Sequence, residues 1–448
     1  MLHKMIYRMS QVQIIALGYF LVIALGTLLL LLPIATEPGE TTNFLTALFT
    51  ATSATCVTGL VVVDTGIHWT VFGQSVILAM IQIGGLGFMT IGVWFAMFLN
   101  RKITLRTRGL LQESMNTSQV GGVVRLAKTA IKGTVFIECI GAVLLSIRFV
   151  PEYGLGKGIC FGIFHSISAF CNAGFDLMGG SKGAYSSFTS YSEDPLVNLV
   201  IMALIVVGGI GFLVWDDVSK HGLAFKHYML HTKLVLTATA VLVFGAAFLF
   251  YLFEKEHLMA DMGPGETILT SLFSSVTART AGFNTIDTGG LTTSSKLLTM
   301  LLMFIGGSPG STAGGIKTTT IVVLLIYVGS NVRNSGGCNI FGRRLEDDAI
   351  RKASSVMLIS LMMATGASIA ICYLQSLPLE DVMFEIFSAI GTVGMSTGIT
   401  RDLTTASRVI IVLLMYCGRI GSMSFALSFL QRKKARPVQC PVEKVMIG

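Results

Sequence analysis

The stretch ATSATCVTGLVV, residues 51–62, is a short run rich in Thr, Ser, Cys and Gly within a chain that is otherwise strongly apolar. Of the 448 residues, 52% are hydrophobic and only 12% are charged, and the mean hydropathy is +0.74. A soluble domain of this length does not normally show that balance. The composition therefore predicts a protein that crosses a membrane several times, and the polar stretch needs a reason to lie between two apolar segments.

Eight apolar segments reach or approach the roughly 20 residues that a helix needs to cross a bilayer. They are residues 13–34, 71–100, 134–150, 197–215, 234–253, 296–328, 354–373 and 409–430. The first is long and is not followed by a small-residue cleavage site, so we expect an anchor that is retained. An even number of crossings places both termini on the same side of the membrane.

The charged residues sort with this topology. Most of the 32 Lys and Arg fall in the termini and in loops 101–133, 216–233 and 331–353, whereas most of the 24 Asp and Glu fall on the opposite side. Because cytoplasmic loops carry an excess of Lys and Arg, both termini are predicted to be cytoplasmic. The net charge of +8 then follows from topology. Nucleic acid is not an expected partner, because the basic residues are dispersed and lack interleaved aromatic residues.

The opening stretch recurs along the chain. Its four copies are SATCVTGL (53–60), SAFCNAGF (168–175), VTARTAGF (276–283) and SAIGTVGM (388–395), and each ends in Gly followed by an apolar residue. The copies are roughly a quarter of the chain apart, a spacing that indicates an internal repeat.

A second glycine motif follows each copy in phase, which strengthens the repeat. Its forms are IGGLGF (83–88), VGGIGF (207–212), IGGSPG (305–310) and CGRIGS (417–422). The predicted units are residues 1–100, residues 101–215 with a preceding cytoplasmic loop, residues 216–331, residues 332–431, and a cytoplasmic tail at 432–448.

Each unit has the same layout: a spanning helix, a short amphipathic stretch such as NFLTALFTATSA (43–54), the glycine segment and a second spanning helix. The amphipathic stretch is too short to cross the bilayer, so we expect a re-entrant half-helix. Irregular backbone at membrane depth is tolerated only where it is buried or lines water. The predicted fold is an all-α polytopic membrane protein. Its four parallel repeats surround one pore with pseudo-fourfold symmetry, giving eight spanning helices and four half-helices.

Four glycine segments that meet on one axis can form an ion-binding site. They can present rings of carbonyl oxygens that replace the hydration shell of an ion. Glycine suits this role because it adopts positive φ without a Cβ clash. The half-helices direct their partly negative C-terminal ends at the pore, which favours a cation, and acidic outer loops would concentrate cations at its mouth.

At TCVTGL, FCNAGF, RTAGF and GTVGM the chain resembles the Trk/Ktr/HKT superfamily of potassium transporters, most closely the bacterial Ktr membrane subunit, and the resemblance covers nearly the whole chain. It implies a potassium filter with one glycine per repeat. The implied filter residues are Cys56, Val57, Thr58, Gly59, Cys171, Asn172, Ala173, Gly174, Thr280, Ala281, Gly282, Thr392, Val393 and Gly394. Glycine in all four copies implies potassium, and the departure from TVGYG predicts weaker discrimination than a potassium channel has.

GGSPGSTAGGIK (306–317) places five glycines and Pro309 inside an apolar segment, so we expect it to unwind into a loop below the filter. A phosphate-binding loop is excluded because Ile316 separates Gly315 from Lys317. The alternative is close packing by small residues, which we expect for IGGLGF and VGGIGF. In the resembling family the equivalent loop obstructs the ion path. The implied gate residues are Gly306, Gly307, Ser308, Pro309, Gly310, Ser311, Thr312, Gly314, Gly315 and Arg419.

Arg419 replaces a glycine of the second motif in copy four, deep in an apolar segment. A buried guanidinium is costly and faces a pore or a partner. We expect it to act as an electrostatic barrier beside the loop; the alternative is a salt bridge to Glu138 or bonds to backbone carbonyls. Arg279 is expected to hold the third filter segment through carbonyl contacts, and Lys317 to cap or pair at the end of the loop.

The family resemblance also implies potassium as the transported ion, with no organic cofactor in this chain. It implies membrane lipid around a homodimer in a bacterial plasma membrane, with one pore per protomer, and a cytosolic nucleotide-binding regulatory subunit of RCK type that responds to ATP and ADP. An ion-coupled transporter for another solute is the alternative, but such folds have inverted repeats and coupling carboxylates. No enzyme site is apparent, and the eight Cys show no CxxC pattern.

Overall fold

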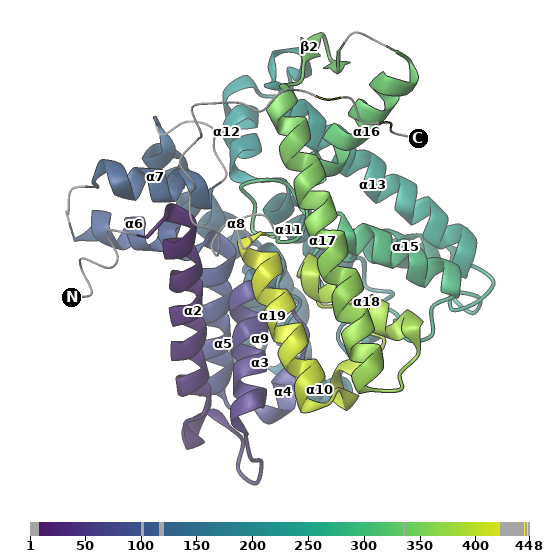
Figure 1. Ribbon diagram of the computed structural model, residues 1–448. Coiled ribbons are helices and arrows are strands. Elements are labelled where there is room, and N and C mark those ends of the chain that lie inside the picture. Colours follow the sequence, from purple (N-terminus) through teal and green to yellow (C-terminus); the bar gives the residue numbers. More distant parts are fainter. Residues whose placement is uncertain are drawn as a thin grey trace.

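The computed structural model describes residues 9–99, 103–115, 121–334 and 337–421, together with residues 443 and 446. This part of the chain is almost entirely helical, and its strands β1 (Asn339–Ile340) and β2 (Arg343–Arg344) form one small antiparallel hairpin. Residues 422–430 of the last apolar segment lie outside the described residues, as does the tail at 432–448 apart from residues 443 and 446. Figure 1 shows the hairpin at one end of the bundle, the hairpin end, and α10 at the other, the α10 end.

Each repeat unit is called a copy from here on, and the first helix of each copy is unbroken. These helices are α2 (Gln11–Leu30), α8 (Val123–Tyr153), α13 (Leu230–Glu254) and α17 (Asp347–Leu374). Each is long and apolar enough to cross a bilayer, and most of its apolar window is not buried inside the protein. Large apolar side chains such as Phe20, Phe244 and Ile369 are more than half exposed. That surface suits contact with lipid, because the backbone groups of a helix are satisfied internally.

The second element of each copy is a short buried helix, as the sequence predicts. These half-helices are α3 (Phe44–Cys56), α9 (Leu155–Phe170), α14 (Pro264–Thr277) and α18 (Leu379–Gly391). Asn43 caps the start of α3, because its side chain accepts from the Thr46 amide, and the helix ends where Val57 adopts left-handed backbone. The half-helices lie inside the bundle, and the large apolar core forms around them and the glycine segments.

The last helix of each copy is interrupted or ends at its second glycine motif. Helices α5 (Val71–Leu86) and α6 (Phe88–Phe98) meet at 96°, as do α11 (Pro195–Gly209) and α12 (Phe212–His221). In copy three, residues 305–317 separate α15 (Thr293–Phe304) from α16 (Thr318–Val332). In copy four, α19 (Thr405–Ile420) ends before Gly421.

The apolar segments 71–100 and 197–215, each expected to be one spanning helix, are therefore bent pairs of helices. Gly87 and Gly211 have φ of 81° and 96°, and a right-handed helix cannot continue through that backbone. The expected close packing does hold for the earlier glycines of these motifs. A Cβ on Gly84 or Gly208 would collide with a backbone carbonyl oxygen at the end of a half-helix. The motif thus combines a packing surface with a bend.

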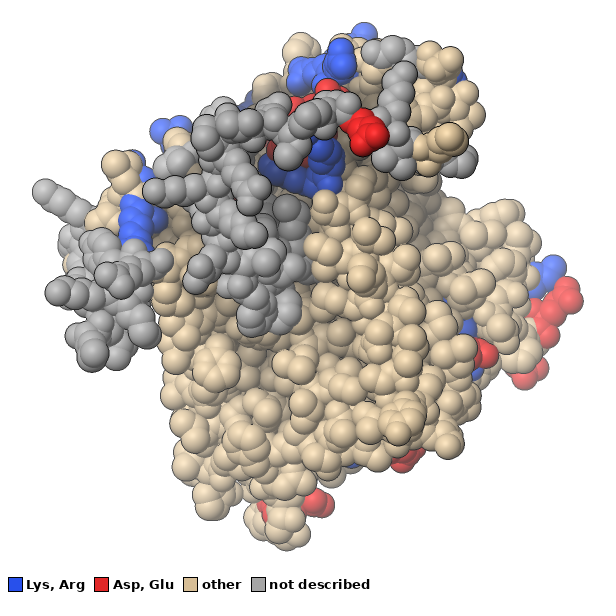
Figure 2. All heavy atoms as spheres, viewed as in Figure 1, with Lys and Arg blue, Asp and Glu red and all other residues tan. Residues whose placement is uncertain are grey.

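Short elements complete both ends of the bundle. They are η1 (Pro33–Ala35), α4 (Thr65–His68), α7 (Leu105–Ser114), α10 (Gly179–Lys182), η2 (Thr189–Tyr191), η3 (Phe225–His227) and η4 (Ile399–Asp402). On the face shown in Figure 2, most visible Lys and Arg lie at the hairpin end, and a broad band without charged residues separates them from the acidic residues at the opposite edge.

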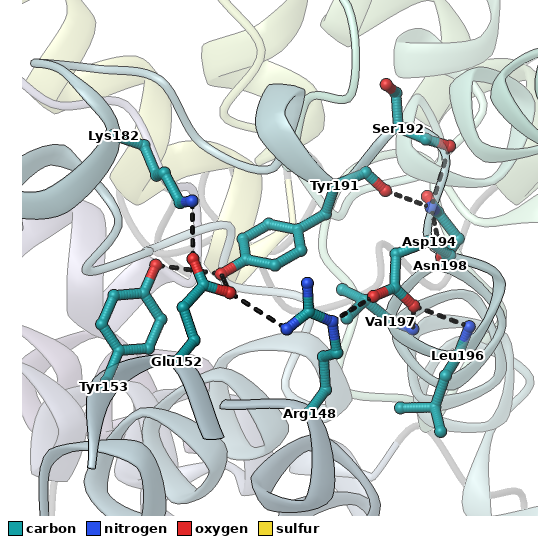
Figure 3. A network of polar contacts seen from close by, with 10 residues as sticks. All are labelled: Arg148, Glu152, Tyr153, Lys182, Tyr191, Ser192, Asp194, Leu196, Val197 and Asn198. Atoms are coloured by element: carbon teal, nitrogen blue, oxygen red, sulfur yellow. Dashed lines mark hydrogen bonds and ion pairs between the residues drawn. The ribbon is translucent and has the colours of Figure 1, made fainter. Parts of the chain in front are cut away.

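A polar network fixes the loop that carries α10 (Figure 3). Arg148 on α8 contacts Asp194 at 2.6 Å and Glu152 at 3.1 Å, and Glu152 also contacts Lys182 at 2.6 Å. The Tyr191 hydroxyl donates to the same Glu152 carboxylate at 3.0 Å. The hydrogen bond with Glu152 raises the pKa of Lys182, so this lysine stays charged. Lys182 and Tyr191, which flank residues 183–190, therefore both bind the carboxylate of Glu152.

Candidate functional site

The four glycine segments meet at one place. A Cβ built on Gly59 would lie 2.5 Å from the carbonyl oxygen of Ala173 and 3.3 Å from the Cα of Gly394. Each of the four glycines has the same relation to the residue just before the glycine of the next copy. The pairs are Gly59–Ala173, Gly174–Ala281, Gly282–Val393 and Gly394–Thr58. The relation runs once around a closed ring, which is the arrangement that the fourfold repeat predicts.

The backbone of the ring follows one pattern in all copies. The glycines have φ between 68° and 91°. The residue two positions earlier is left-handed in every copy, although it is never glycine: Val57, Asn172, Thr280 and Thr392. Such backbone is costly for these residues and persists only where the surroundings impose it. The predicted filter residues are buried in all four copies, apart from a partly exposed Gly394.

Hydroxyl groups from the half-helices brace each segment. Ser53 and Ser388 accept hydrogen bonds from the amides of Gly59 and Gly394, each at 3.0 Å. In the other copies Ser168 donates to the Phe175 carbonyl at 2.7 Å, and Thr277 donates to the Phe283 carbonyl at 2.6 Å. The sequence reasoning missed these residues. The signal was present, because a serine lies six residues before the glycine in three of the four copies.

The unwound segment of copy three lies against the broken helix of copy two. The bend between α11 and α12 leaves carbonyl groups without helical partners. The Ser308 amide donates to Gly209 at 3.0 Å, and the Thr312 amide donates to Gly208 at 3.3 Å. In return, the Gly310 carbonyl accepts from the Phe212 amide at 2.8 Å. The prediction that 306–317 forms a loop is therefore confirmed, and the loop has defined backbone partners.

The same loop also touches the glycine ring. The Thr312 hydroxyl lies 3.0 Å from the Phe170 carbonyl oxygen, at the end of α9, and 3.1 Å from Asn172 Oδ1. A Cβ on Gly314 would collide with the side chain of Thr392, and one on Gly315 would lie 2.9 Å from the Gly391 carbonyl oxygen. Because of this close approach, only glycine fits at these two loop positions. The loop thus packs directly beneath copies two and four of the ring.

Arg419 joins the loop to copy one. Its guanidinium donates to the carbonyls of Gly84 and Thr312, and to that of Gly85 at 3.1 Å. The bend after α5 leaves these glycine carbonyls open, so Arg419 supplies the missing donors. The carbonyl alternative is therefore the observed geometry, and the Thr312 contact also places Arg419 beside the loop.

Three other predicted contacts have different outcomes. Glu138 accepts from Gln82 at 3.1 Å, and Arg419 is not its partner. Arg279 lies 3.5 Å from the Thr318 hydroxyl, a long contact to the start of α16. Among the described residues it forms no hydrogen bond to a filter carbonyl, so that prediction is wrong. Lys317 caps the loop as expected, because its Nζ donates to the Ala313 carbonyl at 2.8 Å.

A cavity of about 710 Å³ opens on the hairpin side of the loop. Loop residues 309–311 and 315–317 line it together with Arg419 and with residues of α2 and α17, among them Tyr19 and Lys352. The order along the molecule is therefore glycine ring, loop, cavity.

Removal of the Thr312 hydroxyl should increase the mobility of the loop. Thr312→Val keeps the side-chain shape but removes the hydroxyl that contacts α9. A net hydrogen bond contributes about 1 kcal/mol, so we expect amide hydrogen exchange at 311–314 to accelerate about fivefold. Ser311→Ala is the matched control, because the Ser311 hydroxyl bonds only within the loop, to the Ser308 carbonyl at 2.6 Å. Equal exchange in both variants would contradict the assigned contact.

Comparison with known proteins agrees with this architecture. The model of the TrkH family, described as a cation transport protein, matches residues 4–436. The Ktr system potassium uptake protein B of Bacillus subtilis is 43% identical over 443 residues, covering 98% of this chain and 97% of its own. The potassium/sodium uptake protein NtpJ of Enterococcus hirae is 40% identical over 448 residues, covering 98% of each chain.

A solved structure has the same fold. The crystal structure of the potassium transporter TrkH from Vibrio parahaemolyticus aligns with a TM-score of 0.74, covering 94% of this chain and 86% of that chain, at 16% identity. The family model and the full-length relatives together settle the assignment: the chain belongs to the TrkH family of cation transport proteins.

Proposed function

We propose that this chain is a potassium uptake pathway of a bacterial plasma membrane, in which K⁺ moves passively down its electrochemical gradient through the glycine ring. The observation that carries the proposal is the closed ring of Gly59, Gly174, Gly282 and Gly394, with a backbone carbonyl from the next copy beside each one. Such a ring can replace the water around a cation. The names of the two full-length relatives, which describe potassium or potassium/sodium uptake, agree with it.

The α10 end is then extracellular and the hairpin end cytoplasmic. The gathering of Lys and Arg at the hairpin end supports this orientation, because cytoplasmic loops are enriched in these residues. The half-helices run from the α10 end toward the ring, so their partly negative C-terminal ends face the position of the cation.

The loop at 306–317 and Arg419 form the gate of this pathway. The loop is well placed to obstruct the path, because it lies between the ring and the cavity. Arg419 adds two effects. Its positive charge repels a cation beside it, and its bonds to Gly84 and Thr312 tie the loop to copy one. A gate built in this way opens when the loop leaves its carbonyl partners.

The gate is controlled by a cytosolic nucleotide-binding subunit of RCK type that responds to ATP and ADP, and two copies of this chain form a homodimer in the lipid bilayer. Two observations support a partner at the hairpin end. The first is the group of exposed Lys and Arg there, which lie beside a few Asp and Glu. The second is the name of the Bacillus subtilis relative, which assigns it to a Ktr system.

Growth of a bacterium that lacks its own potassium uptake tests the proposal. Cells that express this chain should grow at low external K⁺, whereas cells with the empty vector should not. Purified protein in liposomes should carry K⁺ in the direction of the K⁺ gradient, and the flux should reverse when the gradient is reversed. Flux that requires an opposing Na⁺ or H⁺ gradient, or a second solute, would favour the alternative of an ion-coupled transporter.

A further inference from the structure

One short segment of copy two contacts the other three copies at the α10 end. We call residues 183–188 the strap. Its Tyr185 hydroxyl donates to the Val62 carbonyl at 3.2 Å, three residues beyond the copy-one glycine. Its Ser187 hydroxyl accepts from the Asn284 amide at 3.1 Å, two residues beyond the copy-three glycine. The guanidinium of Arg401, seven residues beyond the copy-four glycine, lies 4.2 Å from the centroid of the Tyr185 ring.

The strap is held in costly backbone. Tyr185 has φ of 59° and Ser187 has φ of 45°, so two residues with side chains adopt left-handed backbone within three positions. Such backbone persists only where surrounding contacts impose it. The Tyr185 amide donates to Asp64 Oδ2 at 2.7 Å, and the Phe188 amide donates to the Asn284 carbonyl at 2.9 Å. Contacts to copies one and three thus fix the backbone as well as the side chains.

Both ends of the strap are anchored within copy two. Lys182 precedes the strap and Tyr191 follows it, and both contact the carboxylate of Glu152 on α8 (Figure 3). The strap is therefore anchored on both sides to one helix of copy two, and between these anchors it contacts each of the other three copies. Copy one reaches it through Val62 and Asp64, copy three through Asn284, and copy four through Arg401.

We propose that the strap is a positioning element that fixes the outer ends of the other three filter segments relative to copy two, and so sets the preference for K⁺ over Na⁺. This inference rests on the proposed function of the ring. A carbonyl cage that is free to contract accommodates a smaller ion more easily, so cavity size and flexibility decide selectivity together. The strap limits such contraction because the four residues of other copies that it contacts, Val62, Asp64, Asn284 and Arg401, all lie within seven residues of a ring glycine.

Ion flux in liposomes tests the strap, with the ratio of K⁺ to Na⁺ uptake as the readout. Tyr185→Phe removes the bond to Val62 but keeps the ring beside Arg401. Ser187→Gly removes the bonds to Asn284 and to Asp176 but keeps the left-handed backbone. A net hydrogen bond corresponds to about a two- to tenfold effect, so we expect each variant to lower the K⁺/Na⁺ ratio by about that factor while K⁺ uptake continues. Tyr251→Phe, on α13 at the same end, is the matched control.

Thermal stabilisation by K⁺ relative to Na⁺ separates selectivity from folding. The double variant combines Tyr185→Phe with Ser187→Gly. If its K⁺/Na⁺ uptake ratio equals that of the wild type, and K⁺ stabilises it against heat as strongly as the wild type, the proposal is overturned. If the double variant does not fold, Arg401→Gln gives the same test, because it changes only an exposed guanidinium and its contact with Tyr185. A wild-type protein without any K⁺/Na⁺ preference would instead contradict the proposed function of the ring.

Discussion

Gly282→Ser should abolish potassium uptake at low external K⁺. Gly282 has φ of 83°, and a Cβ there would collide with the carbonyl oxygen of Val393 in the next copy. Left-handed backbone costs a residue with a side chain about 1–2 kcal/mol even where space is open. Here the Cβ also displaces a carbonyl of the ring, so we expect K⁺ uptake to fall by at least about tenfold. Growth at low K⁺ and initial uptake rates in the uptake-deficient bacterium measure the effect.

Gly265→Ser is the matched control for this experiment. It introduces the same side chain into the same copy, near the start of α14, where nothing lies within 4 Å of an added Cβ and φ is not positive. We expect it to support wild-type growth. If Gly282→Ser grows equally well at low K⁺ while the protein is present in the membrane, the ring is not the ion path and the filter assignment fails.

The ring could be predicted from the sequence because its backbone requires glycine, a residue type that is visible in the sequence. Glycine at the same phase in four copies marks backbone that a side chain does not tolerate, and the structure places all four glycines together. The second motif was harder to interpret. Gly84 permits close packing, whereas Gly87 permits a bend in the helix. The sequence motif alone does not show which glycine has which role.

The partners of Arg419 and the strap could not be predicted for a different reason. Arg419 donates to backbone carbonyls of Gly84, Gly85 and Thr312, and every residue carries such a group, so no sequence pattern identifies the acceptor. The strap lies in copy two, where the ring glycine and the second glycine motif are 34 residues apart, against 24 or 25 in the other copies. Its left-handed residues, Tyr185 and Ser187, are not types that mark such backbone, and their contacts come from distant copies.

Arg419→Ala should raise K⁺ flux in liposomes that contain this chain without a cytosolic partner. The substitution removes the positive charge from the proposed gate and leaves the carbonyls of Gly84 and Thr312 without their donors. The loop then loses its link to copy one, while its bonds to copy two remain. Hydrogen bonds from a charged group contribute about 1.5–3 kcal/mol each, so the loss of the link corresponds to at least about a tenfold rise in basal flux.

Arg419→Lys separates the two effects of this residue. Lysine keeps the charge, but a single ammonium group does not reproduce the planar fork that reaches two carbonyls at once. We expect an intermediate rise in flux, because the barrier persists and the link is weakened. Lys352→Ala is the control for the cavity, since it removes a cation that lines the same cavity and is paired with Asp348 at 2.7 Å. Wild-type basal flux in Arg419→Ala would remove Arg419 from the gate and leave it the role of capping the end of α5.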